Sequence, residues 1–450
     1  TIRKVAVLGS GVMGSRIACH FANIGVQVLL LDIVPSELNE KDATKGLTTV
    51  SPKFRNQVVN DALAFSLKSN PSPIYSKAHA DRITTGNFTD DMSKIADVDW
   101  IIEVVVENLD IKKIIYEQVE QHRKSGTLVS SNTSGIPIQL MAAARSDDFN
   151  KHFCGTHFFN PPRYLKLLEV IPGPQTDQAV IDFHMEYGEK FLGKTTVLCK
   201  DTPAFIANRV GIFGIMDTLR VVKDLNLTVE EVDRLTGPVV GRPKSATFRT
   251  MDVVGNDTLI KVAQGLHQGL PKDEKNSVFA LPELLQQIEQ NKWYGSKSGS
   301  GFYKKEKNVK GQSQILALDL NTYEYREQVK AKFATLDMTK TIDKLKDRFK
   351  ILLNGKDKAA DFYRQTYLNL FVYVSNRIPE ISDELYRIDD AMRAGFAWEM
   401  GPFQIWDAIG INNAKSLMDD LGISSNSWVD EMIAAGNASF YKVEGGVKKY

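Results

Sequence analysis

The chain alternates between short apolar runs and longer segments whose apolar residues recur at helical spacing, and this continues to about residue 200. The first run, residues 5–8, precedes a segment in which Ile17 and Phe21 fall on one helical face. A second run, residues 26–31, follows it. Later runs predict strands within residues 100–106, 127–132, 153–159, 166–172 and 194–199. Strands that alternate with helices in this way predict an α/β fold with a doubly wound parallel sheet.

Two stretches break the alternation. Residues 34–87 are polar, and residues 52–73 within them predict an amphipathic helix broken at Pro71. This stretch is either an arm that reaches over a substrate or a solvated excursion. After Pro203 long helical segments replace the strands, with a predicted capping box at Thr228 and Glu231. We therefore expect the second part of the chain to be helical.

The helical part contains an internal repeat. FRTMDVVGND at 248–257 recurs as FQIWDAIGIN at 403–412, an offset of 155 positions (403 − 248), and FYK at 302–304 recurs at 440–442. At an offset of 155 Asn208 corresponds to Tyr363, and at 138 Lys297 corresponds to Ala435, so the second copy predicts a structural role. The charged stretch 304–314 predicts a linker. The expected organisation is a sheet domain followed by two related all-α domains, with bounds 1–200, 201–305 and 306–450.

Composition adds limits to this organisation. The chain has 450 residues, 43% hydrophobic and 25% charged, with a formal net charge of +1. This balance gives no electrostatic footprint for nucleic acid or an anionic membrane surface. No apolar run approaches the roughly 20 residues that a membrane helix needs. Three scattered cysteines, Cys19, Cys154 and Cys199, predict small core residues in a reducing, cytoplasmic compartment rather than metal ligands.

The turn after the first predicted strand carries the G-x-G-x-x-G pattern, whose members include Gly9, Gly11, Val12, Met13 and Gly14. Gly9 permits a tight turn, Gly11 lets the backbone approach a pyrophosphate, and Gly14 lets the helix pack close to the strand. The following helix N-terminus offers N–H groups to phosphates. Asp32 closes the second strand, where its carboxylate can accept hydrogen bonds from ribose hydroxyls and repel a 2′-phosphate. The sequence thus predicts bound NAD rather than NADP.

One of the seven histidines stands at a position suited to chemistry. His157 lies late in the strand FCGTHFF, and ligands of open parallel sheets bind outside the carboxyl ends of the strands. Glu169 lies in the next apolar run, where an acid needs a partner, and a histidine N–H is a natural one. The pair predicts a general base with its orienting carboxylate. The alternative is a satisfied core histidine.

Two polar segments add candidates. SSNTSG at 130–135 closes a strand and presents Asn132 and Ser134 toward a cofactor or substrate oxygen, although a helix N-cap explains the segment equally well. DTPAFIANR at 201–209 places Asn208 on the first helix after the sheet. An asparagine in the middle of a helix is unfavourable unless it has a partner.

These motifs together resemble the L-3-hydroxyacyl-CoA dehydrogenases of fatty-acid β-oxidation. The resemblance runs from residue 3 to about 305, through GSGVMGSRIA, VVENLDIKK, SSNTSGIPI, GTHFFNPP, KLLEVI, KDTPAFIANR and SGSGFYKK. It implies a Rossmann-like domain followed by a helical dimerisation domain. The duplicated helical unit looks like the multifunctional proteins in which the dehydrogenase is fused to an enoyl-CoA hydratase, so we expect a hydratase beyond residue 450.

The resemblance assigns roles to individual residues. The catalytic pair of the family falls on His157 and Glu169, and its substrate-contacting positions fall on Ser134 and Asn208. The implied cofactor contacts are Asp32, Glu107, Lys112, Ser134, Asn160 and Lys297. Two departures stand out: Ala204 takes the place of a usual glycine, and KSATFRTMD at 244–252 replaces an MGPFEL-like segment that the second copy keeps as MGPFQIWD.

The expected function is NAD-dependent oxidation of L-3-hydroxyacyl-CoA thioesters to 3-oxoacyl-CoA. Two alternatives have the same nucleotide loop: a dehydrogenase of a small free 3-hydroxy acid or sugar acid, and a non-catalytic NAD-binding scaffold. Because two helical copies in one chain can form the family's dimer interface internally, we expect the dehydrogenase part to be a monomer.

Overall fold

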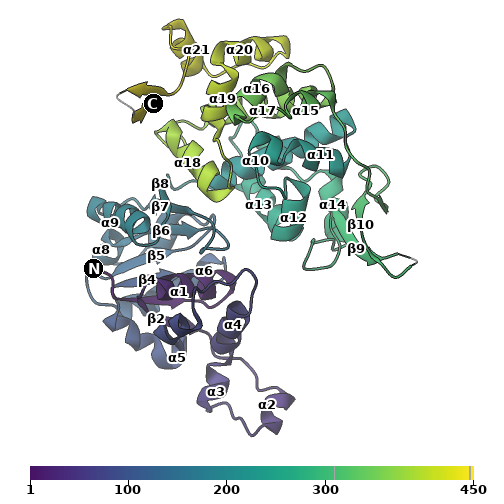
Figure 1. The fold of residues 1–450 in the computed structure, drawn as a ribbon. Helices are drawn as coiled ribbons and strands as arrows, with labels where there is room; N and C mark the ends of the chain where they lie inside the picture. Colours follow the sequence, from purple (N-terminus) through teal and green to yellow (C-terminus); the bar gives the residue numbers. More distant parts are fainter. Residues whose placement is uncertain (309, 445–446) are drawn as a thin grey trace. The chain divides into compact units, whose positions relative to one another are not determined.

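The computed structural model describes residues 1–308, 310–444 and 447–450. The chain divides into two compact units, Thr1–Phe205 and Ile206–Tyr450 (Figure 1). Within the described ranges, none of the helices combines the length and the apolar character that crossing a membrane requires. The three cysteines are free thiols in buried positions, as predicted.

The first unit is built on an eight-stranded sheet with the strand order β3-β2-β1-β4-β5-β6-β7-β8. The first six strands in that order are parallel, so their carboxyl ends share one edge. The order reverses between β1 and β4, which places the nucleotide-binding switch point of such sheets there. The strand bounds are Lys4–Leu8, Gln27–Asp32, Ile83–Asn87, Trp100–Glu103, Leu128–Ser131, Phe153–Phe158, Leu167–Pro172 and Thr195–Leu198 for β1 to β8.

The prediction that all strands of the sheet are parallel is wrong for the last two strands, β7 and β8. β7 runs antiparallel to β6, and β8 is parallel to β7. A parallel pair needs a crossover of a dozen or more residues, whereas residues 159–166 alone join β6 to β7. The short connection turns the chain back along its neighbour, so β7 starts at the edge where β6 ends.

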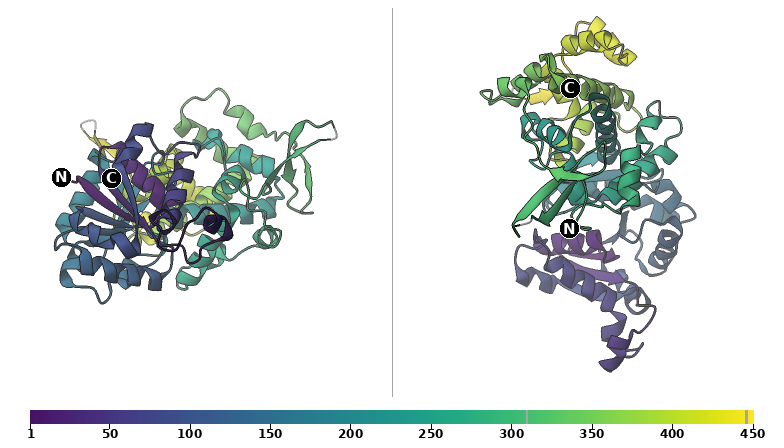
Figure 2. Two further views of the ribbon diagram at one scale, coloured as in Figure 1. Left: turned by 90° about the horizontal axis from the view of Figure 1, so that it is seen from below. Right: turned by 90° about the vertical axis from the view of Figure 1, so that its right-hand side faces the viewer.

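Helices cover both faces of this sheet (Figures 1 and 2). α1 (Val12–Asn23) and α9 (Gln178–Lys190) contribute to one apolar cluster that also contains Cys154 of β6. Neighbouring strand residues point to opposite faces, so Phe153 lies on the other side. There it packs with Tyr116 of α6 (Leu109–His122) and Phe149 of α8 (Asp147–Lys151). A short helix, α7 (Ile138–Ala142), lies between these two in the sequence.

The predicted inserted arm follows β2. Its helices are α2 (Glu40–Thr44), α3 (Pro52–Arg55) and α4 (Gln57–Leu67). α2 and α3 lie away from the sheet (Figure 1), whereas α4 packs against α1, β2 and β3. The amphipathic stretch forms α3 and α4, which meet at Asn56, and α4 ends before Pro71 as predicted. A further short helix, α5 (Phe88–Asp91), follows β3.

The second unit is mainly helical, and the repeat found in the sequence is a repeat in space. Asp252 accepts hydrogen bonds from the N–H groups of Phe302 (2.9 Å) and Tyr303 (2.8 Å), and Asp407 does the same for Phe440 and Tyr441. The helix bounds are Ala207–Leu225, Val229–Leu235, Phe248–Val254, Asn256–Gly269, Glu283–Gln290, Ala334–Met338, Leu345–Asn354, Lys358–Asn376, Leu385–Gly395, Pro402–Ile409, Ile411–Asp420 and Ser427–Ala434 for α10 to α21. The capping box predicted at Thr228 and Glu231 is present.

The all-α description of the second unit needs a correction. The stretch 304–314, predicted to be a linker, contributes to an antiparallel sheet made of β9 (Tyr303–Lys307), β10 (Ser313–Leu318) and β11 (Tyr325–Glu327). The polar residues of this stretch form strands because their backbones pair with each other, with Gln314 opposite Glu306. Two short strands, β12 (Lys442–Glu444) and β13 (Val447–Lys449), pair near the end of the chain.

Candidate active site

The glycine loop between β1 and α1 has the geometry that its sequence predicts. Gly9 has φ +103°, and a Cβ there would lie 2.7 Å from the Val104 carbonyl oxygen. A Cβ on Gly14 would lie 1.8 Å from the carbonyl oxygen of Gly9, so α1 can approach β1 only with glycine here. A Cβ on Gly11, by contrast, would meet nothing within 4 Å. The first turn of α1, which starts at Val12 and Met13, has no side-chain cap, so the loop fits a pyrophosphate.

Asp32 ends β2 beside this loop. Its Oδ2 accepts hydrogen bonds from the N–H (2.6 Å) and the hydroxyl (2.5 Å) of Ser10, and its Oδ1 accepts one from the N–H of Ile33 (2.7 Å). Each carboxylate oxygen can accept more than one hydrogen bond, so this anchored carboxylate can also take ribose hydroxyls. Ile33 and Val106 follow strand ends at this edge with exposed apolar side chains, which the sequence pattern did not single out.

A buried polar network lies at the end of β4, and its central residue, Glu103, was not identified from the sequence. Glu103, at the end of β4, is fully buried and accepts hydrogen bonds from Lys112 Nζ (2.8 Å), Tyr116 OH (2.7 Å) and Ser131 Oγ (2.6 Å). Burial and the facing carboxylate of Glu103 raise the pKa of the Tyr116 phenol. Lys112 is itself 1% exposed. Its ammonium therefore anchors the strand end, and Glu107 is its second carboxylate contact at 3.4 Å.

Glu107 joins this network to the loop that carries Ser134. Its Oε1 accepts hydrogen bonds from Thr133 Oγ1 (2.6 Å) and from the N–H groups of Ser134 (2.9 Å) and Gly135 (3.2 Å). Partial burial alone would raise the pKa of Glu107, but the Lys112 ammonium and these donors hold it below its usual range. The carboxylate thus stays charged and fixes the loop.

His157 and Glu169 meet as the sequence predicts. They are register partners on β6 and β7, and His157 Nδ1 lies 2.8 Å from Glu169 Oε2. Ser134 Oγ lies 3.2 Å from the other ring nitrogen, Nε2. Glu169 is fully buried and His157 is 4% exposed, with Phe159 and Phe205 against the imidazole at 4.7 and 5.7 Å between ring centroids. The carboxylate of Glu169, the imidazole of His157 and the hydroxyl of Ser134 thus form a hydrogen-bonded chain.

The loop between β6 and β7 carries Asn160, whose Oδ1 accepts a hydrogen bond from Arg16 of α1 at 2.5 Å. Lys194 holds the same loop from below, because its ammonium donates to the carbonyl oxygens of Pro162 and Leu165 (2.8 Å to the latter). Burial lowers the pKa of Lys194 to about 8.

Two predicted site residues belong to the second unit. Asn208 is half-buried in the first turn of α10, not in the middle of a helix as predicted. Lys297 is exposed, and its ammonium lies 2.7 Å from Asp257 Oδ2 near the start of α13. Ala204, where the family has glycine, has φ +59°, which is the left-handed region that glycine adopts most easily.

Two sequence interpretations around Ser134 are corrected. Asn132 is turned into the sheet, where its Oδ1 accepts the N–H of Phe158 at 2.8 Å. Ser134 is not a helix N-cap, because α7 begins at Ile138 and the N–H groups of Ile138 and Gln139 are bonded to Asp201. Among the residues that the structure describes, no three histidine, cysteine or acidic side chains gather into a set that could hold a metal ion.

Comparison with known proteins agrees with this arrangement. Residues 4–202 match the family model described as 3-hydroxyacyl-CoA dehydrogenase, NAD binding domain, and residues 205–305 match the C-terminal domain of the same family. A probable 3-hydroxyacyl-CoA dehydrogenase of Bacillus subtilis is 47% identical over 100% of this chain and 56% of its own length. A putative fatty acid oxidation complex trifunctional enzyme of Rickettsia felis is 31% identical over 90% of this chain and 53% of its own.

The chain spans about half the length of these two relatives. The crystal structure of 3-hydroxybutyryl-CoA dehydrogenase from Escherichia coli shares the fold, with a TM-score of 0.64 at 21% identity over 97% of this chain and 99% of its own. The glycine loop, the anchored Asp32 and the family models make the first unit an NAD-binding domain. The chain belongs to the 3-hydroxyacyl-CoA dehydrogenase family.

Proposed function

We propose that this chain oxidises L-3-hydroxyacyl-CoA thioesters to 3-oxoacyl-CoA with NAD⁺, in fatty-acid β-oxidation. The observation that carries the proposal is the line from Glu169 through His157 to Ser134 at the carboxyl edge of the sheet. The Bacillus relative, a probable 3-hydroxyacyl-CoA dehydrogenase, supports the substrate class, and the Rickettsia relative, a putative fatty acid oxidation complex enzyme, supports the metabolic setting.

The hydrogen bonds of His157 assign its proton. A carboxylate only accepts hydrogen bonds, so Nδ1 carries the hydrogen that faces Glu169, and Nε2 keeps its lone pair toward Ser134. Nε2 then takes the proton of the 3-hydroxyl group, and the nearby carboxylate stabilises the imidazolium that forms. NAD⁺, held beside the glycine loop and Asp32, would supply the hydride acceptor for C3, so that loss of the proton to Nε2 and of the hydride from C3 together change C–OH to C=O.

The remaining assignments position the substrate and the cofactor. Ser134 and Asn208 hydrogen-bond the 3-oxygen as it changes from hydroxyl to carbonyl. Asp32 holds the adenosine ribose, and Glu107, Lys112, Ser134, Asn160 and Lys297 complete the cofactor contacts. The anchoring of Asp32 at Ser10 and of Glu107 at residues 133–135 supports these roles.

The test is NADH oxidation with acetoacetyl-CoA, run beside free acetoacetate and beside NADPH. We expect rapid turnover only with the thioester and NADH. Turnover of free acetoacetate would favour the small-acid dehydrogenase, and tight NADH binding without turnover of either substrate would favour the scaffold.

A variant tests the base. Replacing His157 with glutamine (His157→Gln) should lower turnover by about 10²–10⁴-fold, the usual contribution of general-base catalysis, with NADH affinity retained. His152→Gln is the matched control, because this histidine directly precedes β6 and its Nδ1 bonds the Asp148 carbonyl oxygen. Near-normal turnover in His157→Gln would disprove the assignment.

The wider organisation is part of the proposal. We assign residues 1–200 to the NAD-binding domain, 201–305 to a first helical domain and 306–450 to its second copy. A fused enoyl-CoA hydratase, a monomeric dehydrogenase part and a cytoplasmic location complete it. Packing of α10 against α17 within one unit supports the internal interface. A concentration-independent dimer in light scattering would argue against the monomer.

A further inference from the structure

The first turn of α10 is tied to the second copy through Arg209. This side chain is fully buried, and its guanidinium donates to Tyr373 OH, Asp273 Oδ2 and Glu380 Oε1, each at 2.8 Å. Tyr373 in turn donates to Asp273 Oδ2 at 3.0 Å. Tyr373 belongs to α17 and Glu380 to the connection after it, so most of this shell comes from the second copy.

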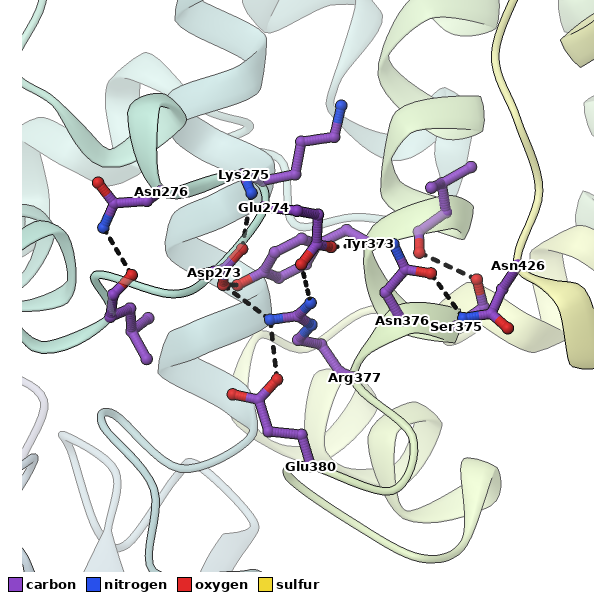
Figure 3. A network of polar contacts seen from close by, with 12 residues as sticks. Asp273, Glu274, Lys275, Asn276, Tyr373, Ser375, Asn376, Arg377, Glu380 and Asn426 are labelled. Atoms are coloured by element: carbon purple, nitrogen blue, oxygen red, sulfur yellow. Dashed lines mark hydrogen bonds and ion pairs between the residues drawn. The ribbon is translucent and has the colours of Figure 1, made fainter.

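Arg377 completes the network, and Figure 3 shows its contacts with Asp273, Glu274 and Glu380. Its Nη1 lies 2.8 Å from both Asp273 Oδ2 and Glu380 Oε2, and its Nη2 lies 2.5 Å from Glu274 Oε2. The side chains of Arg209, Asp273 and Arg377 are 0%, 1% and 4% exposed. Buried charges tolerate little displacement, because each lost contact leaves a desolvated charge without its partner. The network therefore fixes the guanidinium of Arg209.

Apolar packing fixes the same helix one turn further on. The rings of Phe213 and Tyr373 are stacked, with centroids 3.8 Å apart and an angle of 2° between the planes. Tyr373 thus contacts α10 at two residues four positions apart, which lie on one helical face. The two contacts together fix the first turn of α10 against rotation about the helix axis and against displacement along it.

The connection that supplies Arg377 and Glu380 is specific to the second copy. Residues 377–384 join α17 to α18, whereas residues 226–228 join the corresponding α10 and α11. The longer connection therefore supplies two charged members of the network around Arg209.

We propose that the second copy positions Asn208: Tyr373 and Arg377 hold Arg209, and Arg209 fixes the helical turn that presents the neighbouring Asn208 to the substrate oxygen. This inference rests on the proposed role of Asn208 in the reaction. The second copy is then more than a structural filler, because it controls the placement of a substrate contact.

Tyr373→Phe is the sharpest test, because it removes the hydroxyl and keeps the ring on Phe213. We expect kcat with acetoacetyl-CoA to fall by roughly tenfold, since small misplacements of a contact group cost up to about 10²-fold. The affinity for NADH should stay within twofold. The matched control is Tyr363→Phe: Tyr363 is also buried on α17, and its hydroxyl donates to the Leu235 carbonyl oxygen of the first copy at 2.7 Å. Tyr363→Phe should lower the melting temperature by about as much as Tyr373→Phe does, while its kcat stays at the wild-type value.

Asn208→Ala separates this inference from the proposed function. If Asn208→Ala keeps wild-type kcat, the proposed role of Asn208 fails, and the inference fails with it. If Asn208→Ala lowers kcat, Tyr373→Phe should have no further effect in that background, because both changes act through one contact. Two outcomes would overturn the positioning role alone. One is a kcat of the double variant that is a further tenfold below that of Asn208→Ala, and the other is equal kcat in Tyr373→Phe and Tyr363→Phe.

Discussion

Both copies of the helical repeat tie the start of a helix to a tyrosine through an aspartate. In the first copy Asp233 accepts the N–H of Phe248 and the hydroxyl of Tyr303, each at 2.7 Å. In the second copy Asp389 accepts the N–H of Phe403 at 2.8 Å and the hydroxyl of Tyr441 at 2.7 Å. Burial, together with the facing carboxylate, raises the pKa of both phenols. The framework of the two copies is the same.

The copies differ at the start of their long helices. α10 and α17 have 19 residues each and begin 151 positions apart (358 − 207), so Asn208 corresponds by position to Ala359 and not to Tyr363, as the offset of 155 predicted. Ala359 and Ala360 are fully buried. The comparison teaches that the repeated contacts build the fold, while the polar side chains proposed to take part in the reaction are confined to one copy.

The largest effect is expected for Asp252 and Asp407, the equivalent aspartates that each accept two backbone N–H groups near the end of their copy. In Asp252→Asn and Asp407→Asn an amide N–H₂ replaces one oxygen that accepts a backbone N–H. We expect each to lower the free energy of unfolding by about 2–3 kcal/mol, since it leaves a buried N–H unpaired.

Activity should separate the two variants. The main-chain carbonyl oxygen of Asp252 also accepts a hydrogen bond from the N–H of Ser296, next to Lys297. A shift of the Asp252 backbone after its side-chain bonds to the two backbone N–H groups are weakened would displace Lys297, so Asp252→Asn should raise the KM for NADH. Asp407→Asn should leave it unchanged. Urea unfolding and steady-state kinetics measure both quantities, and equal kinetic effects would remove the functional distinction between the copies.

Two glycines of α10 probe the contact between the copies. A Cβ on Gly211 would lie 2.1 Å from the Phe396 ring, whereas a Cβ on Gly214 would meet nothing within 4 Å. Gly211→Ala should therefore cost about 1–3 kcal/mol of unfolding free energy through overpacking. Gly214→Ala should gain up to about 1 kcal/mol from helix propensity. Thermal unfolding of both variants is the measurement, and stabilisation by Gly211→Ala would show that the copies do not pack tightly there.

The smallest effect concerns how each long helix begins. α17 has a side-chain cap from Asp357 to the N–H of Ala360, while α10 follows two left-handed residues, Ala204 and Phe205. Ala204→Gly should raise the free energy of unfolding by about 0.5–1 kcal/mol, because it relieves the Cβ strain of that conformation. Denaturant unfolding at constant m-value tests this, and a loss of stability would mean that the Ala204 methyl group has a packing role.

The sequence predicted best those features that a local pattern determines. The glycine loop, Asp32 and the pairing of His157 with Glu169 follow from residue types at strand ends, and the structure has them in place. The roles of these residues in catalysis and cofactor binding remain predictions.

Features that depend on partners distant in the sequence were harder to predict. The antiparallel β7 was missed, although the short connection after β6 carried the signal. Glu103 was missed too, and its signal was an acid inside the apolar run WIIEVVV, which must be paired when buried. β9 has no apolar alternation, and it forms by backbone pairing with β10. The apolar run 315–318 of β10, which starts where the predicted linker ends, was missed, although Leu316, Ala317 and Leu318 are buried.

The contact between α10 and α17 has a further consequence because one chain carries both helices. Separate subunits with this interface would follow mass action, and dilution would dissociate them. A covalent connection instead keeps each partner at an effective concentration on the order of millimolar. The network around Arg209 is therefore assembled in every molecule at any protein concentration, so the specific activity of the proposed reaction should not fall as the protein is diluted.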